Sequence, residues 1–194
     1  MNKCPNYNFA TNAAYKVLEN YTGPYPQIDI FKVVSNLSNV SIHTYSETAT
    51  KFGFTFPQFL DVAMSVHGYT AYNTISKKGT IYFNDLKGER TIRFTVAHEL
   101  GHIILGHAQD NDVARSEANC FARNLLCPVP LRDGYHLKTV QDYCECFNIS
   151  EYMAKITRDW NSSDEFYISK ENYNIINDRS NVYISGYTLS ELYG

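Results

Sequence analysis

The sequence predicts an α+β fold: a mostly helical single domain with a small antiparallel sheet beside one central helix and a helical segment toward the C-terminus. Apolar residues recur at helical spacing along most of the chain, whereas two short segments between residues 67 and 85 alternate apolar and polar residues as strands do. The 194 residues, 44% of them hydrophobic and 19% charged, are enough to bury one core.

The N-terminal third is predicted to contain short helices around one strand. Apolar residues share one face of a helix over residues 9–21, which ends where TGPYPQ breaks the pattern. The same reasoning predicts a helix at 28–38, a strand at 40–46 and a helix at 57–65 that begins with proline.

A hairpin and two longer helices follow. HGYTAYNTI (67–75) and GTIYFND (79–85) are predicted strands, because SKKG between them is typical of a hairpin. A helix is predicted from Glu89 to His107, and a second over 110–128 that is capped by an aspartate at its start.

The C-terminal third is predicted to begin with two short helices, at 138–147 and 150–160, and its tyrosine-rich tail is expected to form a loose hairpin through EFYIS and NVYIS. These elements divide the chain into a core of residues 1–130, a helix-turn-helix-like segment of residues 131–160 packed on the core, and a tail of residues 161–194.

Charge and cysteine content limit the partners and the location. A net charge of −3 gives no electrostatic reason to bind nucleic acid. No segment resembles a signal peptide or a membrane span, so a cytoplasmic protein without membrane contact is expected. Five cysteines without a CxxC pair are expected to be free thiols in a reducing compartment.

The central helix carries the motif HELGH. His98 and His102 stand one turn apart on the same face, where two imidazoles can hold one Zn²⁺ at roughly 2.0–2.1 Å each. Glu99 is displaced around the helix, so that its carboxylate flanks the metal and can act as general base toward a bound water.

Chance is the alternative explanation of this motif. In a chain with six histidines, an accidental HExxH arises in roughly one sequence in a hundred. The helix, however, has a separate apolar stripe that anchors it without the histidines, formed by Ile92, Val96, Leu100 and Ile103. The context therefore favours a zinc site.

A catalytic zinc needs a third protein ligand. His107 does not fit the long HExxHxxGxxH pattern, and if the helix continues it lies about 180° around the axis from His98. A cation at the helix C-terminus is the preferred interpretation of His107.

Glu117 on the following helix is the better third ligand, because an apolar face (Ala118, Phe121, Ala122, Leu125) can dock that helix against the first. Phe121 occupies the position where the ExxxD pattern has an aspartate, so a carboxylate that supports a ligand histidine must come from elsewhere. Cys120 is a possible soft ligand, but a buried structural thiol is favoured.

Taken together, RFTVAHELGHIILGH and SEANCFARNLLCP resemble the ImmA/IrrE family of metallo-endopeptidases. The second string matches the family's EAxxFAxxLLxP pattern through Glu117, Ala118, Phe121, Ala122, Leu125, Leu126 and Pro128. GTIYFND resembles the strand that precedes the family's metal helix, and FNIS stands where the family has a Phe-x-Val-Ser turn. The resemblance covers about residues 25–160 and is most specific over 80–130.

The resemblance implies a zincin-like peptidase core over residues 1–130. It implies zinc held by the residues that match His98, His102 and Glu117, with Glu99 as the catalytic acid/base. It also implies the substrate: members of the family cleave helix-turn-helix repressors of mobile elements, phages or stress regulons.

Further contributions to a peptidase reaction are expected from outside the motif. The edge of the GTIYFND strand is a candidate for holding an extended peptide, and Tyr72, Tyr135 and His136 are candidates for stabilising the oxyanion. Arg93, which lies five residues before His98, is expected to form a structural ion pair.

Two alternatives to a peptidase are a DNA-binding regulator and a catalytically quiet zinc-containing protein that binds a repressor or DNA. The helix pair after residue 137 has three basic residues against four acidic ones, which is unfavourable for reading DNA: Lys138, Lys155, Arg158, Asp142, Glu145, Glu151 and Asp159. Glu99 argues against a quiet site, because a structural zinc has no use for a base beside it.

Overall fold

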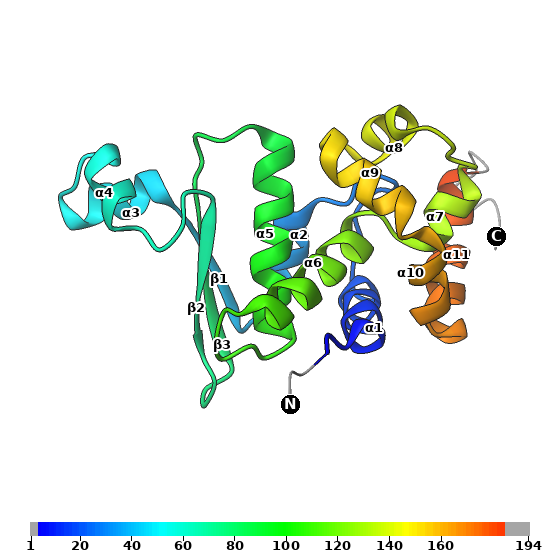
Figure 1. Ribbon diagram of the computed structural model, residues 1–194, viewed down its shortest axis with the longest axis horizontal. Helices are drawn as coiled ribbons and strands as arrows, with labels where there is room; N and C mark the ends of the chain where they lie inside the picture. Colours follow the sequence, from blue (N-terminus) through cyan, green and yellow to red (C-terminus); the bar gives the residue numbers. More distant parts are fainter. Residues whose placement is uncertain (1–3, 185–194) are drawn as a thin grey trace.

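The computed structural model describes residues 4–184 and has the α+β fold that the sequence predicts (Figure 1). In chain order its elements are α1 (Tyr7–Leu18), α2 (Ile30–Ser35), β1 (Val40–Thr44), α3 (Tyr45–Phe52), α4 (Phe56–Val62), β2 (Gly68–Asn73), β3 (Lys78–Phe83), α5 (Glu89–Ile104), α6 (Asp112–Leu126), α7 (Val129–Gly134), α8 (Val140–Phe147), α9 (Glu151–Asp159), α10 (Asn161–Tyr167) and α11 (Lys170–Ile184).

The three strands form a mixed sheet in the order β1-β3-β2, rather than the antiparallel sheet expected. β2 and β3 are the predicted hairpin and pair antiparallel, whereas β1 pairs parallel with β3. The parallel pairing is possible because α3 and α4 lie between β1 and β2 and lengthen the connection. As a result β3 is the central strand and β2 an edge.

Helix α3 lies where the predicted strand was expected to continue. Thr44 Oγ1 accepts a hydrogen bond from the Glu47 backbone at 3.0 Å, and the Glu47 carboxylate accepts one from the Thr44 backbone at 3.1 Å. This capping box ends β1 and starts the helix one residue later. Its S/T-x-x-E signature is visible in the sequence.

Helix α5 packs between the sheet and α6 (Figure 1), and one glycine permits the second of these contacts. A Cβ at Gly101 would lie 3.2 Å from the Ala118 Cα, which is tighter than most Cβ contacts and would push the two helices slightly apart. The predicted docking of α6 is confirmed by Phe121, Ala122 and Leu125, which are fully buried. The N-cap of α6 is Asn111, whose side chain accepts from the Ala114 backbone, and not an aspartate.

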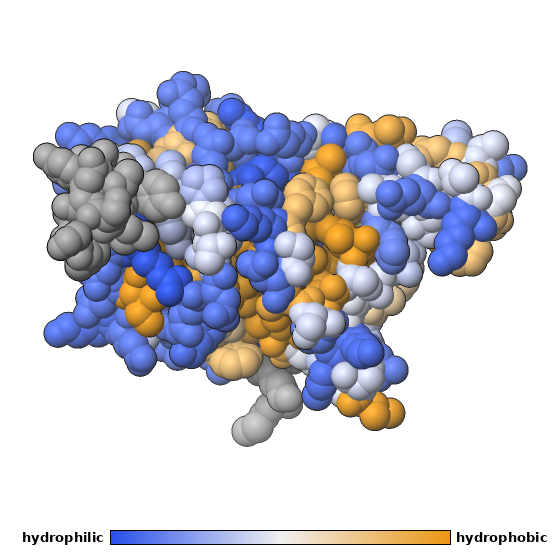
Figure 2. All heavy atoms as spheres, turned by 180° about the vertical axis from the view of Figure 1, so that it is seen from behind, coloured by the Kyte–Doolittle hydropathy of each residue, from blue (hydrophilic) through white to orange (hydrophobic). Residues whose placement is uncertain are grey.

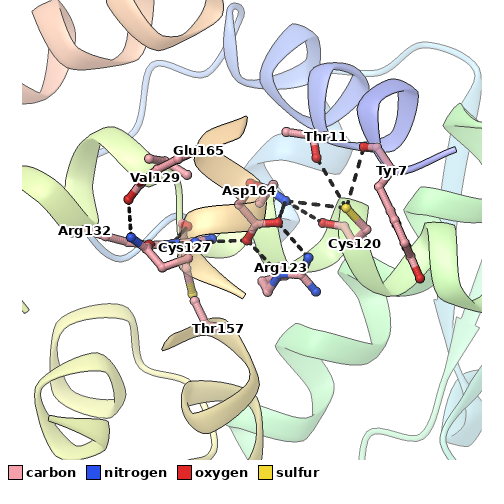
Figure 3. Close-up of polar contacts among 12 residues, drawn as sticks. Tyr7, Thr11, Cys120, Arg123, Cys127, Val129, Arg132, Thr157, Asp164 and Glu165 are labelled. Atoms are coloured by element: carbon pink, nitrogen blue, oxygen red, sulfur yellow. Dashed lines mark hydrogen bonds and ion pairs between the residues drawn. The ribbon is translucent and has the colours of Figure 1, made fainter. Parts of the chain in front are cut away.

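The C-terminal part is helical, and the predicted tail hairpin is wrong for the described residues. α10 and α11 pack beside α1 and α7 at the opposite end of the molecule from the sheet (Figure 1). Asp164 of α10 is fully buried and bonds to Arg123 at 2.7 Å and to Arg132 at 3.0 Å, so its carboxylate lies between the two guanidinium groups (Figure 3). This cluster anchors α10 to α6 and α7. Residues 185–194 lie outside the described residues.

Three general properties of the molecule remain: the state of its cysteines, the distribution of hydrophobic residues on its surface and the hydropathy of its helices. All five cysteines are free thiols, as predicted. Seen from behind, hydrophobic residues gather in a band down the middle of the molecule (Figure 2). Within residues 4–184, no helix is both long enough and apolar enough to cross a bilayer.

Candidate metal centre

The two histidines of the HELGH motif face each other from consecutive turns of α5. Their Nε2 atoms are 3.1 Å apart, and their ring centroids are 4.8 Å apart. Two ligands of one tetrahedral ion at about 2.05 Å each would be separated by roughly 3.3 Å, close to the distance found. Both rings line a cavity of about 620 Å³ between α5 and β2.

The protonation state of this pair suits a metal. Burial lowers the pKa of His98 to about 4. Burial, with smaller contributions from the neighbouring His98 and His107, lowers the pKa of His102 to about 4 as well. Both rings are therefore neutral at physiological pH, which is the form in which an imidazole binds a metal. These two residues fit a zinc ion.

Glu99 lines the same cavity and is held by the edge strand. The Thr70 hydroxyl lies 2.9 Å from Glu99 Oε2 and 3.1 Å from the Glu99 carbonyl oxygen, and it donates to them. Burial raises the pKa of Glu99 to about 7, against the opposing effect of the Thr70 hydrogen bond. A carboxyl group with a pKa near neutrality can both accept and return a proton in one reaction cycle.

His107 lies beside His102, and not on the far side of the helix from the HELGH histidines as predicted. The predicted helix continues to His107, but α5 ends at Ile104 and Gly106 has a φ of 71°. The His107 N–H donates to the His102 carbonyl at 3.0 Å and the Gly106 N–H to the Ile103 carbonyl at 3.1 Å, a Schellman ending. The reversal brings the His107 ring back to His102, with centroids 5.0 Å apart.

Glu117 does not contact His98 or His102 directly in the hydrogen bonds found; it contacts His107, which in turn contacts His102. Its Oε2 is 2.9 Å from His107 Nε2, while His107 Nδ1 is 3.0 Å from His102 Nδ1. Its Oε1 accepts a 2.6 Å hydrogen bond from the Asn6 backbone. Within the described part of the chain, no three His, Cys, Asp or Glu side chains stand in an arrangement that would hold a metal ion. Glu117 as third ligand therefore stays a prediction.

The cavity shows which of the other candidates are near the site. Tyr72 lines it, together with Tyr69 and Thr70 of the same strand. Tyr135 and His136 directly follow α7, at the end of the molecule away from the sheet (Figure 1). The expectation that the GTIYFND strand offers a free edge is wrong, because β3 is paired on both sides and β2 borders the cavity.

Arg93 is structural, as expected, but its partner is not a carboxylate. Its guanidinium is buried and Nη2 donates to the Phe147 carbonyl at 3.2 Å, which ties α8 to α5. Burial lowers the pKa of Arg93.

The positions of His107 and Thr70 beside the motif were not predicted from the sequence. The signal for His107 was Gly106, because a glycine at the end of an apolar helical pattern predicts a helix stop. Thr70 had no comparable signal, because the residue that meets Glu99 depends on how the sheet packs against α5.

A family model described as the IrrE N-terminal-like domain of peptidases matches residues 46–153. The matched span runs from α3 to the first turn of α9 and includes the HELGH motif, β2, β3 and all of α6. No curated protein and no solved structure matches the chain.

Proposed function

Because the chain belongs to the IrrE N-terminal-like peptidase family, which is of the metallopeptidase type, we propose that it is a zinc-dependent endopeptidase. The observation that carries the proposal is the pair of neutral, facing imidazoles with Glu99 beside them in one cavity. His98 and His102 would hold the ion, with Glu117 as the predicted third ligand. When bound, zinc supplies a Lewis acid and lowers the pKa of a bound water to about 7.

The chain's own groups then have definite tasks. Glu99 takes a proton from the attacking water and returns it to the departing amine, and Thr70 keeps the carboxylate in position for both transfers. The edge strand β2 holds the substrate in extended form by main-chain hydrogen bonds, and Tyr72 faces the same cavity, where it can stabilise the oxyanion.

We further propose that the substrate is a helix-turn-helix repressor, so that cleavage derepresses a mobile element, a prophage or a stress regulon. The support is the family alone. A cytoplasmic location agrees with such a substrate. The alternative is a catalytically quiet zinc-containing protein that binds a repressor or DNA; it is favoured by one observation, namely that both Glu117 oxygens are already engaged by protein groups.

The test is to incubate the purified protein with the repressor encoded beside its gene, with and without a chelator, and to look for discrete fragments. Glu99→Gln should abolish the fragments while zinc content stays near one equivalent per chain. Glu171→Gln, an exposed change on α11, is the matched control and should cut like the wild type. Fragments that persist with Glu99→Gln or after chelation would refute the zinc-peptidase assignment; bound repressor without fragments would favour the quiet alternative.

A further inference from the structure

A second cavity of about 320 Å³ opens between α5, α6 and α9, and it has no role in the proposed chemistry. Its volume is at the small end of the range for ligand pockets. Half of its lining residues are aromatic or aliphatic, and these are Tyr7, Phe94, Tyr152, Met153, Ile156 and Trp160.

This apolar cavity adjoins the candidate metal centre. Thr91, Phe94 and Asn119 line both cavities. Phe94 lies one turn before His98 on α5, with the two rings 6.1 Å apart between centroids. The four residues from Phe94 to His98 advance the helix by about 6 Å, whereas an extended peptide advances by about 3.3 Å per residue. The apolar cavity is therefore about two residues away from a peptide bond held at the metal centre.

The cationic group on the floor of the apolar cavity has its charge compensated by a buried carboxylate. The Arg123 guanidinium lies 4.9 Å from the centre of the Trp160 ring. Its Nε and Nη2 donate to Asp164 at 2.8 and 2.7 Å, as Figure 3 shows for the ion pair. Because the charge of Arg123 is already matched and its position fixed, the cavity is preorganised and does not select an acidic group.

The walls favour an apolar occupant. Met153 and the aromatic rings of the lining offer favourable contacts to an aromatic or aliphatic side chain of a ligand. The Met153 thioether adds a favourable sulfur–aromatic contact if that side chain is aromatic. At the exposed rim, the Nε–H of Arg90 donates a hydrogen bond to Asn148 Oδ1 at 3.1 Å.

We propose that this apolar cavity is a substrate subsite that takes a bulky aromatic or aliphatic side chain of the peptide, about two residues from the bond that is cut. The proposal deepens the peptidase assignment and rests on it. The lining residues that it shares with the cavity of the metal centre favour an occupant that belongs to the same peptide.

Trp160 is the chain's single tryptophan and lies in the cavity wall, so its fluorescence reports on occupancy without any cleavage. N-acetylphenylalaninamide should change this fluorescence with a Kd on the order of millimolar, as its size allows, whereas N-acetylalaninamide should not in the same range. Ile156→Phe fills the cavity and should weaken binding at least about tenfold. Lys155→Phe, on the same helix but exposed, should not, and Ile156→Ala should still bind.

A digest of a mixed peptide library assigns the cavity to the substrate. Cleavage sites of the wild type should be enriched in Phe, Leu or Met at one fixed position, and Ile156→Phe should shift that position alone toward small residues. Equal responses to the two amides, or a preference that Ile156→Phe leaves unchanged, would overturn the subsite. Should the amide bind while the wild type cuts nothing, the proposed function and the subsite both fail, and the apolar cavity remains only as a binding pocket.

Discussion

Replacing His107 by alanine tests whether the residue does more than end a helix. His102 can present its Nε2 lone pair to a metal only if its Nδ1 carries the proton, and His107 Nδ1 is the acceptor 3.0 Å away. His107 then carries its own proton on Nε2 and donates it to Glu117 at 2.9 Å. The carboxylate thus sets the tautomer of His102 through the intervening ring.

The size of the effect follows from burial. The side chains of His107 and Glu117 are only 11% and 15% exposed, so water replaces the lost ring poorly. Removing such a supporting partner typically lowers metal affinity about 10–100-fold, which is about 1.4–2.7 kcal/mol. We expect His107→Ala to fall in this range. His107→Gln should recover much of the loss, because its amide can accept from His102 and donate to Glu117.

Zinc affinity is measured by competition with a chromophoric chelator, and the His102 tautomer by nitrogen NMR of the ring. His67→Ala is the matched control, since His67 lines the same cavity but is exposed. The reasoning is refuted if His107→Ala binds zinc as tightly as the wild type, or if His67→Ala loses as much.

Two further substitutions probe the carboxylates. Thr70→Val removes the hydroxyl that holds Glu99 and should lower kcat/KM about 10–100-fold at unchanged zinc content. Steady-state kinetics and metal analysis measure the two quantities, and unchanged kinetics would contradict the positioning role of Thr70. Burial alone would raise the pKa of Asp164, but hydrogen bonds from Arg123 and the charge of Arg132 hold it below its usual value. Its contribution to the free energy of unfolding is therefore complete above the unfolded-state pKa of about 3.9 and is lost as the pH falls through the lower folded-state value. Asp164→Asn should cost about 3–5 kcal/mol at neutral pH and remove this acid dependence, as followed by urea denaturation at several pH values; an equal loss at every pH would contradict it.

The elements that the sequence predicted well are those specified locally. The apolar stripe of α5 and the turn residues between β2 and β3 act over a few positions, so their patterns survive in the structure. Helix α3 was missed because Tyr45, an aromatic residue of the kind enriched in strands, directly follows β1, and the capping box at Thr44 was the stronger signal.

The tail was wrong for a different reason. EFYIS alternates like a strand, but α10 is fixed by Asp164, whose partners Arg123 and Arg132 are distant in sequence. A tertiary contact of this kind overrides weak local preference and leaves no periodic trace. The same holds at the site: His98, Glu99 and His102 follow from spacing on one helix, whereas the contact of Thr70 with Glu99 depends on the packing of two elements.

Glu117 can act either as a metal ligand or as the hydrogen-bond partner of His107, and its Oε2 cannot do both at once. Its Oε1 can keep the Asn6 hydrogen bond in either case, but Oε2 can serve either His107 or a metal ion. A Glu117→Gln and His107→Ala double-mutant cycle separates the two. If Glu117 is a ligand, its substitution lowers zinc affinity by more than His107→Ala, and the double variant is weaker still. If Glu117 acts through His107, each single variant already removes the whole effect, and the double variant binds zinc no more weakly than either one.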